Sequence, residues 1–187
     1  MEAGQLELEP DPESVARLIC LRLLTAAPRT RAQLADALRR RGVPDEAAAA
    51  VLARFTEVGL IDDAMFASAW VESRHVGRGL GRRALTAELS RRGVERGDIE
   101  SAMARLTPES ELATARALVE RRLASTAGVP ADARVRRLAG MLARKGYPSG
   151  LAYRVVREAL EAEGQQPGWT DGADSDDEPL GSDWPGE

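Results

Sequence analysis

The apolar residues of this chain recur every three or four positions over most of its length, which is the spacing of an α-helix. From residue 16 onward, one helical face carries Ala16, Cys20, Leu23, Leu24 and Ala27. No stretch of four to eight residues alternates apolar and polar side chains with the β-branched and aromatic enrichment of a strand. The pattern therefore predicts an all-α fold.

Capping residues and helix breakers indicate where these helices begin and end. Asp11 precedes Pro12 and Thr107 precedes Pro108, and both pairs are typical of a helix start. Residues 30–33 have the Thr-x-x-Gln spacing of a capping box. Glycine and proline predict breaks at Pro28, 42–44, Gly59, 77–81, Gly93, 128–130 and 146–148. The chain should thus form helices joined by short turns.

One short motif occurs three times. In each copy a leucine stands four residues before a glycine, and two basic residues immediately precede that glycine. The copies are residues 38–43 (LRRRGV), 89–94 (LSRRGV) and 142–147 (LARKGY). The sixth, ninth and tenth residues after each glycine are apolar, which places an apolar face on a following helix. With further helices upstream, near 14–27, 62–74 and 109–124, the pattern predicts three tandem three-helix repeats in an elongated solenoid.

The repeats should occupy the middle of the chain, between two acidic tails. We expect repeats at 14–60, 61–107 and 108–163, with tails at 1–13 and 164–187. The C-terminal tail is rich in Asp, Gly, Pro and Ser and has no helical or strand period. We expect both tails to be disordered, because they cannot bury enough apolar surface to offset their chain entropy.

The charge distribution separates the tails from the body. The net charge is −4, but residues 1–13 carry five acids and no base, and residues 161–187 carry nine acids and no base. Residues 14–160 hold all 26 basic residues against 16 acids, a net charge of +10. A basic body indicates a protein that meets a polyanion, or a protein that lies beside one.

The basic residues of the repeated motif have two interpretations. Cations in the last turn of a helix are stabilised by the helix dipole by about 0.5 kcal/mol, and glycine supplies a left-handed cap, so the motif can be structural. Stacked repeats would, however, place the three pairs in a spaced row, which suits a periodic partner. The glycine-rich segment 74–83 is also strongly basic, and it is either a solvated hinge or a contact to an anionic partner. The candidate contacts are Arg40, Arg41, Arg74, Arg78, Arg82, Arg83, Arg91, Arg92, Arg144 and Lys145.

The inventory for catalysis or metal binding is sparse. There is one histidine, His75, and one cysteine, so neither a nucleophile–base pair nor a zinc site can be assembled. We expect His75 to be an exposed loop residue and the Asp62–Asp63 pair to cap a helix. The glycines of 77–81 follow a helix and lack the Gly-Lys-Ser/Thr ending of a phosphate-binding loop. The sequence therefore predicts no enzyme, no cofactor and no metal.

Cysteine usage and hydropathy indicate the compartment. A single cysteine allows no disulfide framework, which fits a reducing cytoplasm. The first residues are acidic and lack the apolar run of a signal peptide, and no apolar stretch approaches about 18 residues. We expect a cytoplasmic protein that does not enter a membrane.

Direct DNA binding remains as an alternative function. Residues 30–63 resemble part of a winged helix-turn-helix transcription factor, in which a β-hairpin wing should follow residues 59–61. Here the chain continues AMFASAWVESRH, which predicts a helix. A helix-turn-helix regulator is therefore the second hypothesis. The body also has few aromatic residues, which argues against a stacking platform for single-stranded bases.

The combined pattern resembles the RecX family of recombination regulators. The resemblance covers roughly residues 14–160 and is most specific in the second repeat. The residues that carry it are Gly59–Leu60–Ile61–Asp62–Asp63, Phe66–Ala67, Trp70–Val71, Arg74, Gly81, Leu85, Glu88–Leu89, Arg92–Gly93–Val94 and Ile99. The repeat ending in residues 144–148 matches the family pattern more loosely, and the acidic tail is outside it.

The resemblance implies a curved, three-repeat helical molecule that lies in the deep groove of a RecA filament on DNA. Members of this family are expected to hinder ATP turnover, strand exchange and repressor cleavage by RecA, and to limit filament growth. We therefore expect RecA to be the partner and DNA contact to be weak or made through the filament. We also expect the chain to be a monomer.

Overall fold

The computed structural model of the chain describes residues 11–164 and shows an all-helical fold. Most of both acidic tails, which were expected to be disordered, lies outside the described residues. Within the described part there are nine α-helices, one short 3-10 helix and no strand, so the predicted fold class is confirmed. The helices are α1 (Pro12–Ala26), α2 (Arg31–Arg39), α3 (Asp45–Glu57), α4 (Asp63–Arg78), α5 (Arg82–Arg91), α6 (Arg96–Met103), α7 (Pro108–Leu123), α8 (Ala131–Arg144) and α9 (Ser149–Ala162).

The predicted helix starts are confirmed by their caps. The side chain of Asp11 accepts a hydrogen bond from the backbone N–H of Ser14 at 3.1 Å, and Thr30 forms the capping box that opens α2. One predicted break is misplaced, because α4 continues through Gly77 and ends at Arg78, with Gly79 in the left-handed region at φ 62°. A glycine inside a helix costs only about 1 kcal/mol, which the packing of α4 offsets.

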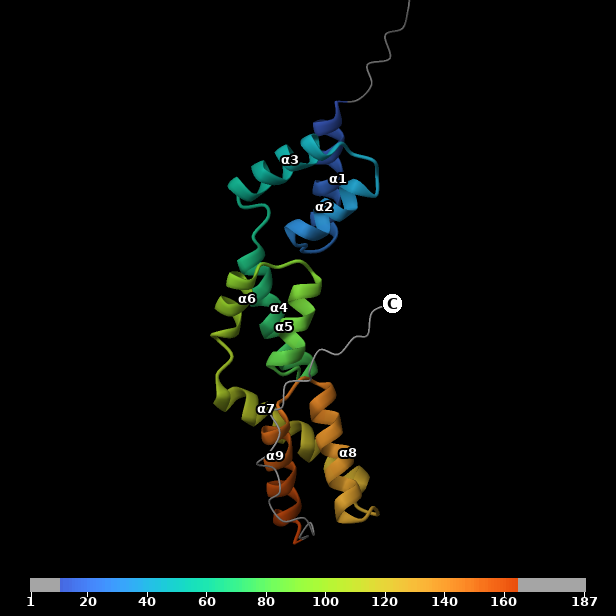
Figure 1. Ribbon diagram of the computed structural model, residues 1–187, viewed down its shortest axis with the longest axis vertical. Coiled ribbons are helices and arrows are strands. Elements are labelled where there is room, and N and C mark those ends of the chain that lie inside the picture. The colour runs from blue at the N-terminus through green and yellow to red at the C-terminus, as the bar shows by residue number, and fades with distance from the viewer. Residues whose placement is uncertain (1–10, 165–187) are drawn as a thin grey trace, which may run out of the picture.

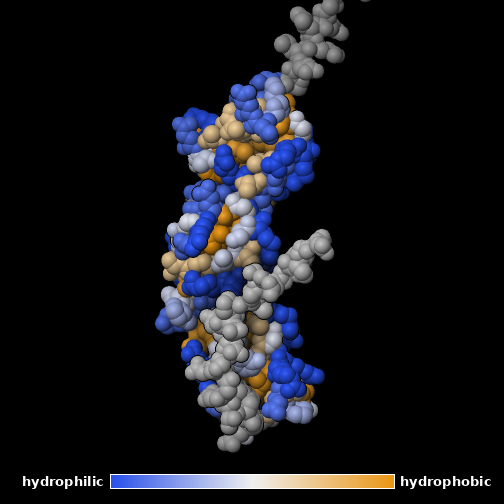
Figure 2. Space-filling view, in the orientation of Figure 1, coloured by the Kyte–Doolittle hydropathy of each residue, from blue (hydrophilic) through white to orange (hydrophobic). Residues whose placement is uncertain are grey.

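The helices form a curved stack of three groups, α1–α3, α4–α6 and α7–α9, along one long axis (Figure 1). Each group has an apolar core of its own. The sixth, ninth and tenth residues after each motif glycine are all buried, on α3, α6 and α9. Figure 2 shows this arrangement from outside, as small apolar areas separated by hydrophilic surface. The predicted repeat pattern therefore corresponds to one core per group of helices.

Each copy of the repeated motif ends the second helix of its group and forms a tight turn. We call these turns corner 1 (40–43), corner 2 (91–94) and corner 3 (144–147). Their glycines have φ values of 72°, 74° and 88° at Gly42, Gly93 and Gly146. These are left-handed conformations that favour glycine. The preceding leucines at 38, 89 and 142 are fully buried, which anchors each corner to its own core.

Corner 2 docks onto the start of α2 in the preceding group of helices. The buried hydroxyl of Thr30 donates a hydrogen bond to the carbonyl of Arg92 at 2.6 Å. A Cβ atom on Gly93 would lie 2.3 Å from the Cβ of Ala32, so only glycine allows this approach. Asp63 accepts a hydrogen bond from the backbone N–H of Arg31 at 2.9 Å. We call this contact the first junction.

Corner 3 docks in the same way onto the start of α5, and this contact is the second junction. The backbone N–H groups of Gly81 and Arg83 donate to the carbonyls of Lys145 and Gly146 at 2.8 and 3.2 Å. A Cβ atom on Gly146 would lie 2.3 Å from the backbone nitrogen of Ala84. The repeated motif therefore joins the repeats, in addition to capping its own helix.

Candidate partner-binding surface

The predicted contact residues gather at the two junctions and at corner 1. The first junction holds Arg91 and Arg92, with Arg74 nearby. The second junction brings together Arg78, Arg82, Arg83, Arg144 and Lys145, which come from α4, α5 and the end of α8. Arg40 and Arg41 lie apart from these, at corner 1. Sequence spacing predicted that the three basic pairs of the repeated motif (40–41, 91–92 and 144–145) are equivalent. It could not show that segments 60 or more residues apart meet.

At the first junction, two arginines lie over one aromatic ring. The guanidinium carbons of Arg74 and Arg92 are 4.1 and 3.7 Å from the centre of the Trp70 ring. The indole N–H donates to Glu88 at 2.8 Å, and Phe66 stacks on the ring with centres 5.6 Å apart. Such cation–π contacts contribute about 0.5–2 kcal/mol each. They hold the two guanidinium groups in fixed positions against the ring.

Arg92 is the half-buried member of the basic pair at corner 2. Its pKa is lowered, mainly because the guanidinium is partly buried, and the nearby Glu88 carboxylate opposes this shift. One guanidinium N–H of Arg92 also donates to the carbonyl of Glu88 at 3.2 Å. Arg91, by contrast, is exposed. Within this pair, Arg92 therefore organises the junction, and Arg91 is the side chain that a partner can reach.

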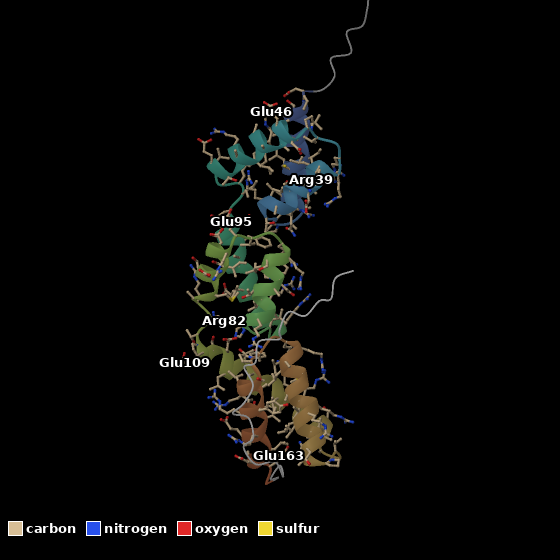
Figure 3. The ribbon with its side chains drawn as sticks, in the orientation of Figure 1. Arg39, Glu46, Arg82, Glu95, Glu109 and Glu163 are labelled. Carbon is tan, nitrogen blue, oxygen red and sulfur yellow. The ribbon has the colours of Figure 1, made fainter. Side chains whose placement is uncertain are left out.

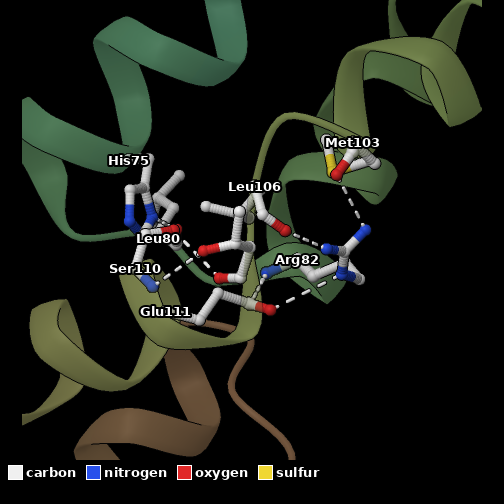
Figure 4. A network of polar contacts seen from close by, with 8 residues as sticks. His75, Leu80, Arg82, Met103, Leu106, Ser110 and Glu111 are labelled. Carbon is white, nitrogen blue, oxygen red and sulfur yellow. Dashed lines mark hydrogen bonds and ion pairs between the residues drawn. The ribbon is translucent and has the colours of Figure 1, made fainter.

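At the second junction, Arg82 connects three helices (Figure 4). Its guanidinium donates to the carbonyl of Met103, the last residue of α6, at 3.1 Å and to the carbonyl of Leu106 in the turn that follows. It also lies 3.5 Å from the buried carboxylate of Glu111 on α7, and the backbone N–H of Arg82 donates to the same carboxylate at 2.8 Å. Arg82 therefore holds α5, α6 and α7 together.

Lys145 also makes an internal contact. Its ammonium group donates to the carbonyl of Arg78 at 2.6 Å, at the end of α4 where the helix dipole favours a cation. The side chains of Arg78, Arg83 and Arg144 form no ion pair within residues 11–164 and belong to exposed residues. The second junction therefore presents three exposed guanidinium groups around an internally bonded Arg82 and Lys145.

The expectation for His75 is wrong. This residue is in α4 and only 8% exposed, because the helix continues past the predicted break and turns His75 towards α7. Its Nδ1 lies 2.8 Å from the carbonyl oxygen of Leu80 (Figure 4). Its Nε2 lies 2.9 Å from the hydroxyl of Thr114. Gly79 and Gly81 are buried as well. The connector is therefore not a solvated hinge.

Both carboxylates of the aspartate pair cap helices, but different ones. Asp62 accepts from the backbone N–H of Met65 at 2.7 Å and begins α4, as predicted. Asp63 instead accepts from Arg31 and supports the start of α2. Burial raises the pKa of Asp63, and the hydrogen bond from Arg31 opposes this effect.

Acidic and basic side chains lie on all three groups of helices, as the labelled Arg39, Arg82 and Glu163 illustrate (Figure 3). An open groove of about 630 Å³ lies between α5 and α6, with Val94, Ile99 and Met103 among its lining residues. Arg96 and Glu100 in its wall form an ion pair at 2.6 Å.

Within residues 11–164, no group of three His, Cys, Asp or Glu side chains could hold a metal ion. No helix in this part of the chain is long and apolar enough to cross a membrane.

Three models of one family match the chain in order. RecX, first three-helix domain, matches residues 16–55; RecX, second three-helix domain, matches 62–103; and RecX, third three-helix domain, matches 109–156. Two solved structures share the fold. A crystal structure of RecX from Lactobacillus salivarius has a TM-score of 0.74 at 19% identity and covers 80% of this chain and 97% of its own. A crystal structure of regulatory protein RecX has a TM-score of 0.71 at 23% identity, with coverages of 79% and 72%.

Curated relatives are similar over most of their length. Regulatory protein RecX of Thermobifida fusca is 68% identical over 149 residues, which is 80% of each chain. Regulatory protein RecX of Streptomyces lividans is 63% identical over 155 residues, which is 83% of this chain and 82% of the relative. These matches, the three domain models and the shared fold show that the chain belongs to the RecX family of regulatory proteins.

Proposed function

We propose that this protein binds the RecA recombinase filament on single-stranded DNA and inhibits its ATPase, strand-exchange and coprotease activities, thereby regulating DNA repair. The observation that carries the proposal is the set of exposed guanidinium groups at the repeat junctions, on Arg78, Arg83, Arg91 and Arg144. Membership of the RecX family supports the same partner. The protein acts in the cytoplasm, with residues 14–60, 61–107 and 108–163 as its three repeats.

The shape of the molecule suits a periodic polymer. An elongated stack can touch several filament subunits, and each contact raises the effective concentration for the next. Of the seven ion pairs in the described part of the chain, six lie away from the junctions and one holds Arg82 to Glu111, while Arg78, Arg83, Arg91 and Arg144 form none. These four therefore direct positive potential outward, towards acidic protein or DNA phosphates in the filament groove.

Binding to duplex DNA as a transcription factor is less well supported. In the helix-turn-helix hypothesis α3 would be the recognition helix, but its first turn carries Asp45 and Glu46. These carboxylates would face the phosphates that a recognition helix approaches with its N-terminus. In addition, α4 occupies the place of the expected wing. DNA contact is therefore weak or made through the filament.

The test compares binding to three targets: RecA filaments on single-stranded DNA, the bare single strand and a duplex. The variant carries Arg78→Glu, Arg83→Glu, Arg91→Glu and Arg144→Glu. Each reversal should weaken binding about threefold, so the four together should weaken filament binding by about 100-fold. The far-UV circular dichroism should stay unchanged, because none of these side chains makes an internal ion pair.

A matched control reverses four exposed arginines away from the junctions, Arg17, Arg22, Arg105 and Arg136. It has the same net charge as the test variant, so non-specific attraction falls equally in both. Filament binding by the control should stay at least about tenfold tighter than by the test variant. Equal weakening by both sets, or binding to bare duplex as tight as to filament, would contradict the proposal.

A further inference from the structure

Helix α8 carries an exposed basic face. Arg136, Arg137 and Arg144 lie on the side of α8 opposite the residues that this helix buries in the core of the third group. Residues 137 and 144 are two turns apart, so they share a face. Within residues 11–164, none of the three arginines forms an ion pair with a carboxylate. We call these three residues the α8 stripe.

The guanidinium groups of the α8 stripe are close together. Gly140 lies between them, and Nη1 of Arg144 is 3.4 Å from the position that a Cβ atom on Gly140 would take. The side chain of Arg144 therefore folds back along α8, towards Arg136 and Arg137. Residues 136 and 144 are about 12 Å apart along the helix axis, which is close to the Debye length of about 10 Å at about 0.1 M salt. Three like charges at this spacing reinforce one another and favour an acidic occupant.

The end of α9 lies beside the start of α8. The two helices lie side by side (Figure 1), and the buried Arg134 of α8 forms an ion pair with Glu163 at 2.7 Å. Gly164 follows with φ 76°, a left-handed conformation that ends α9. In Figure 3, Glu163 marks this end of the stack. Residue 165 therefore follows on directly beside the first turns of α8, next to one end of the α8 stripe.

The sequence from residue 165 onward has the complementary charge. Residues 165–187 contain seven acidic residues and no basic residue. Five of the seven lie between Asp171 and Glu178. The segment also contains Trp169 and Trp184, and tryptophan rings bind guanidinium groups through cation–π contacts. Both of its main side-chain types therefore suit a row of unpaired arginines.

The acidic segment is long enough to reach every part of the α8 stripe. Residues 164 to 171 can span up to about 25 Å of extended chain. Arg134 and Arg144 are only about 15 Å apart along the axis of α8. Because the segment is covalently attached, its effective concentration at the stripe is about millimolar, which favours it over separate polyanions present at lower concentration.

We propose that residues 165–187 lie along the α8 stripe of the same molecule, with the carboxylates of residues 171–178 paired to Arg136, Arg137 and Arg144. In the free protein the segment screens this face from DNA phosphates and other polyanions. The docking itself does not depend on RecA. Arg144 is also one of the four proposed filament contacts, so the docked segment competes with the filament for this residue; this consequence alone rests on the proposed function.

Paramagnetic broadening of NMR signals from the full chain, without RecA, tests the docking. A nitroxide label is attached through Ser175→Cys, among the acidic residues, and Cys20 is fully buried, so the label reacts with the new cysteine. The amide signals of residues 136–144 should lose most of their intensity at about 0.05 M salt. They should recover it at about 1 M salt, where the Debye length is only about 3 Å. Signals from α2 and α3 should stay sharp in both conditions.

Charge reversal identifies the surface that the segment uses. Reversal of the stripe by Arg136→Glu, Arg137→Glu and Arg144→Glu should abolish the broadening of α8. The matched control reverses three exposed arginines on other helices or turns, Arg17, Arg22 and Arg105, and should keep it. Both variants have the same net charge, and both should keep the far-UV circular dichroism of the parent. Sharp α8 signals in the labelled parent at low salt, or broadening that stripe reversal leaves unchanged, would overturn the proposal.

A mixed sample decides whether the contact is made within one molecule. Spin-labelled copies without isotope are mixed with isotope-labelled copies that carry no spin label. The proposal predicts sharp α8 signals in this sample, because each stripe is occupied by the segment of its own chain. Broadening as strong as in the doubly labelled chain would overturn it, because the segment would then bind a second copy.

Binding of a bare single-stranded oligonucleotide tests the screening. Neutralising the segment by Asp176→Asn, Asp177→Asn and Glu178→Gln should tighten binding at low salt at least about threefold more than the matched control Glu2→Gln, Glu7→Gln and Glu9→Gln. Reversing the α8 stripe in addition should remove this difference. Equal tightening by the two neutralised variants would show that only net charge matters, and would contradict the screening.

Discussion

Replacing Gly42, Gly93 or Gly146 by alanine measures how much stability is lost when a side chain is placed at each corner, with or without a docked neighbour. All three glycines have φ between 72° and 88°, so alanine costs about 1 kcal/mol of left-handed strain at each. At Gly42 nothing else is near, and the expected loss of stability is that strain alone. At Gly146 the new Cβ would lie 2.3 Å from the backbone nitrogen of Ala84, which cannot move away without displacing α5.

The loss at Gly146 should therefore be several times larger. Overpacking against backbone costs about 1–3 kcal/mol. Moving corner 3 away would also break the two hydrogen bonds from Gly81 and Arg83, at about 1 kcal/mol each. With the left-handed strain, the expected decrease in the free energy of unfolding is about 4–6 kcal/mol, a large part of the 5–15 kcal/mol typical of a domain. Gly93→Ala, which meets only the Cβ of Ala32, should fall between the two, at about 2–4 kcal/mol.

Urea unfolding followed by far-UV circular dichroism measures all three losses on one scale. The double variant Gly93→Ala/Ala32→Gly removes the clashing atom and should recover about 1–2 kcal/mol beyond the sum of the single changes. The double variant Gly42→Ala/Ala32→Gly should show no such coupling. If Gly42→Ala destabilises the protein as much as Gly146→Ala, these glycines serve only as helix caps and the docking argument fails.

Three further predictions concern the junctions. Arg82→Met should lower the free energy of unfolding by about 2–4 kcal/mol, because the buried Glu111 carboxylate loses its ion-pair partner. Arg83→Met is the control and should change the free energy of unfolding by less than about 0.5 kcal/mol. Similar losses in both variants would contradict the role of Arg82 in holding α5, α6 and α7 together. Thr30→Val should cost about 2 kcal/mol in a thermal or urea melt, because the carbonyl of Arg92 loses its buried donor and the backbone N–H of Gln33 loses its capping acceptor. No loss would mean that the bond to Arg92 does not hold the first junction. Burial raises the pKa of Asp63 above 3.8, so its contribution to stability falls as the pH rises through the raised value. Asp63→Asn should therefore gain stability relative to the parent in urea melts between about pH 3 and about pH 6, and a constant difference would refute the burial effect.

Sequence patterns predicted those features that depend on neighbouring residues. The capping box follows from the spacing of Thr30 and Gln33, and the helix start at Asp62 follows from an acidic pair before an apolar helical pattern. The buried positions follow from apolar residues six, nine and ten places after each motif glycine. The stacking of Arg74 on Trp70 could have been recognised as well, because residues four apart share a helix face. Local spacing therefore predicts the helices, most of their ends and one side of the first junction, but not the end of α4.

Contacts between distant segments could not be predicted in this way. His75 is buried because Thr114, 39 residues later, completes its surroundings. Lys145 is bonded to Arg78 across 67 residues, and no local pattern distinguishes it from the exposed Arg144 beside it. Arg82 and Arg83 are likewise adjacent, but only Arg82 points into a set of carbonyl and carboxylate acceptors. The division of the basic residues into structural and exposed groups therefore required the tertiary structure.

The most direct test of the central claim is ATP hydrolysis by the cognate RecA protein on single-stranded DNA, titrated with this protein at physiological salt. Filament regulation predicts inhibition at amounts well below the RecA concentration, and loss of that inhibition when Arg78, Arg83, Arg91 and Arg144 are reversed together. The control with reversed Arg17, Arg22, Arg105 and Arg136 should still inhibit. Unchanged hydrolysis at equimolar parent protein would contradict the proposed function.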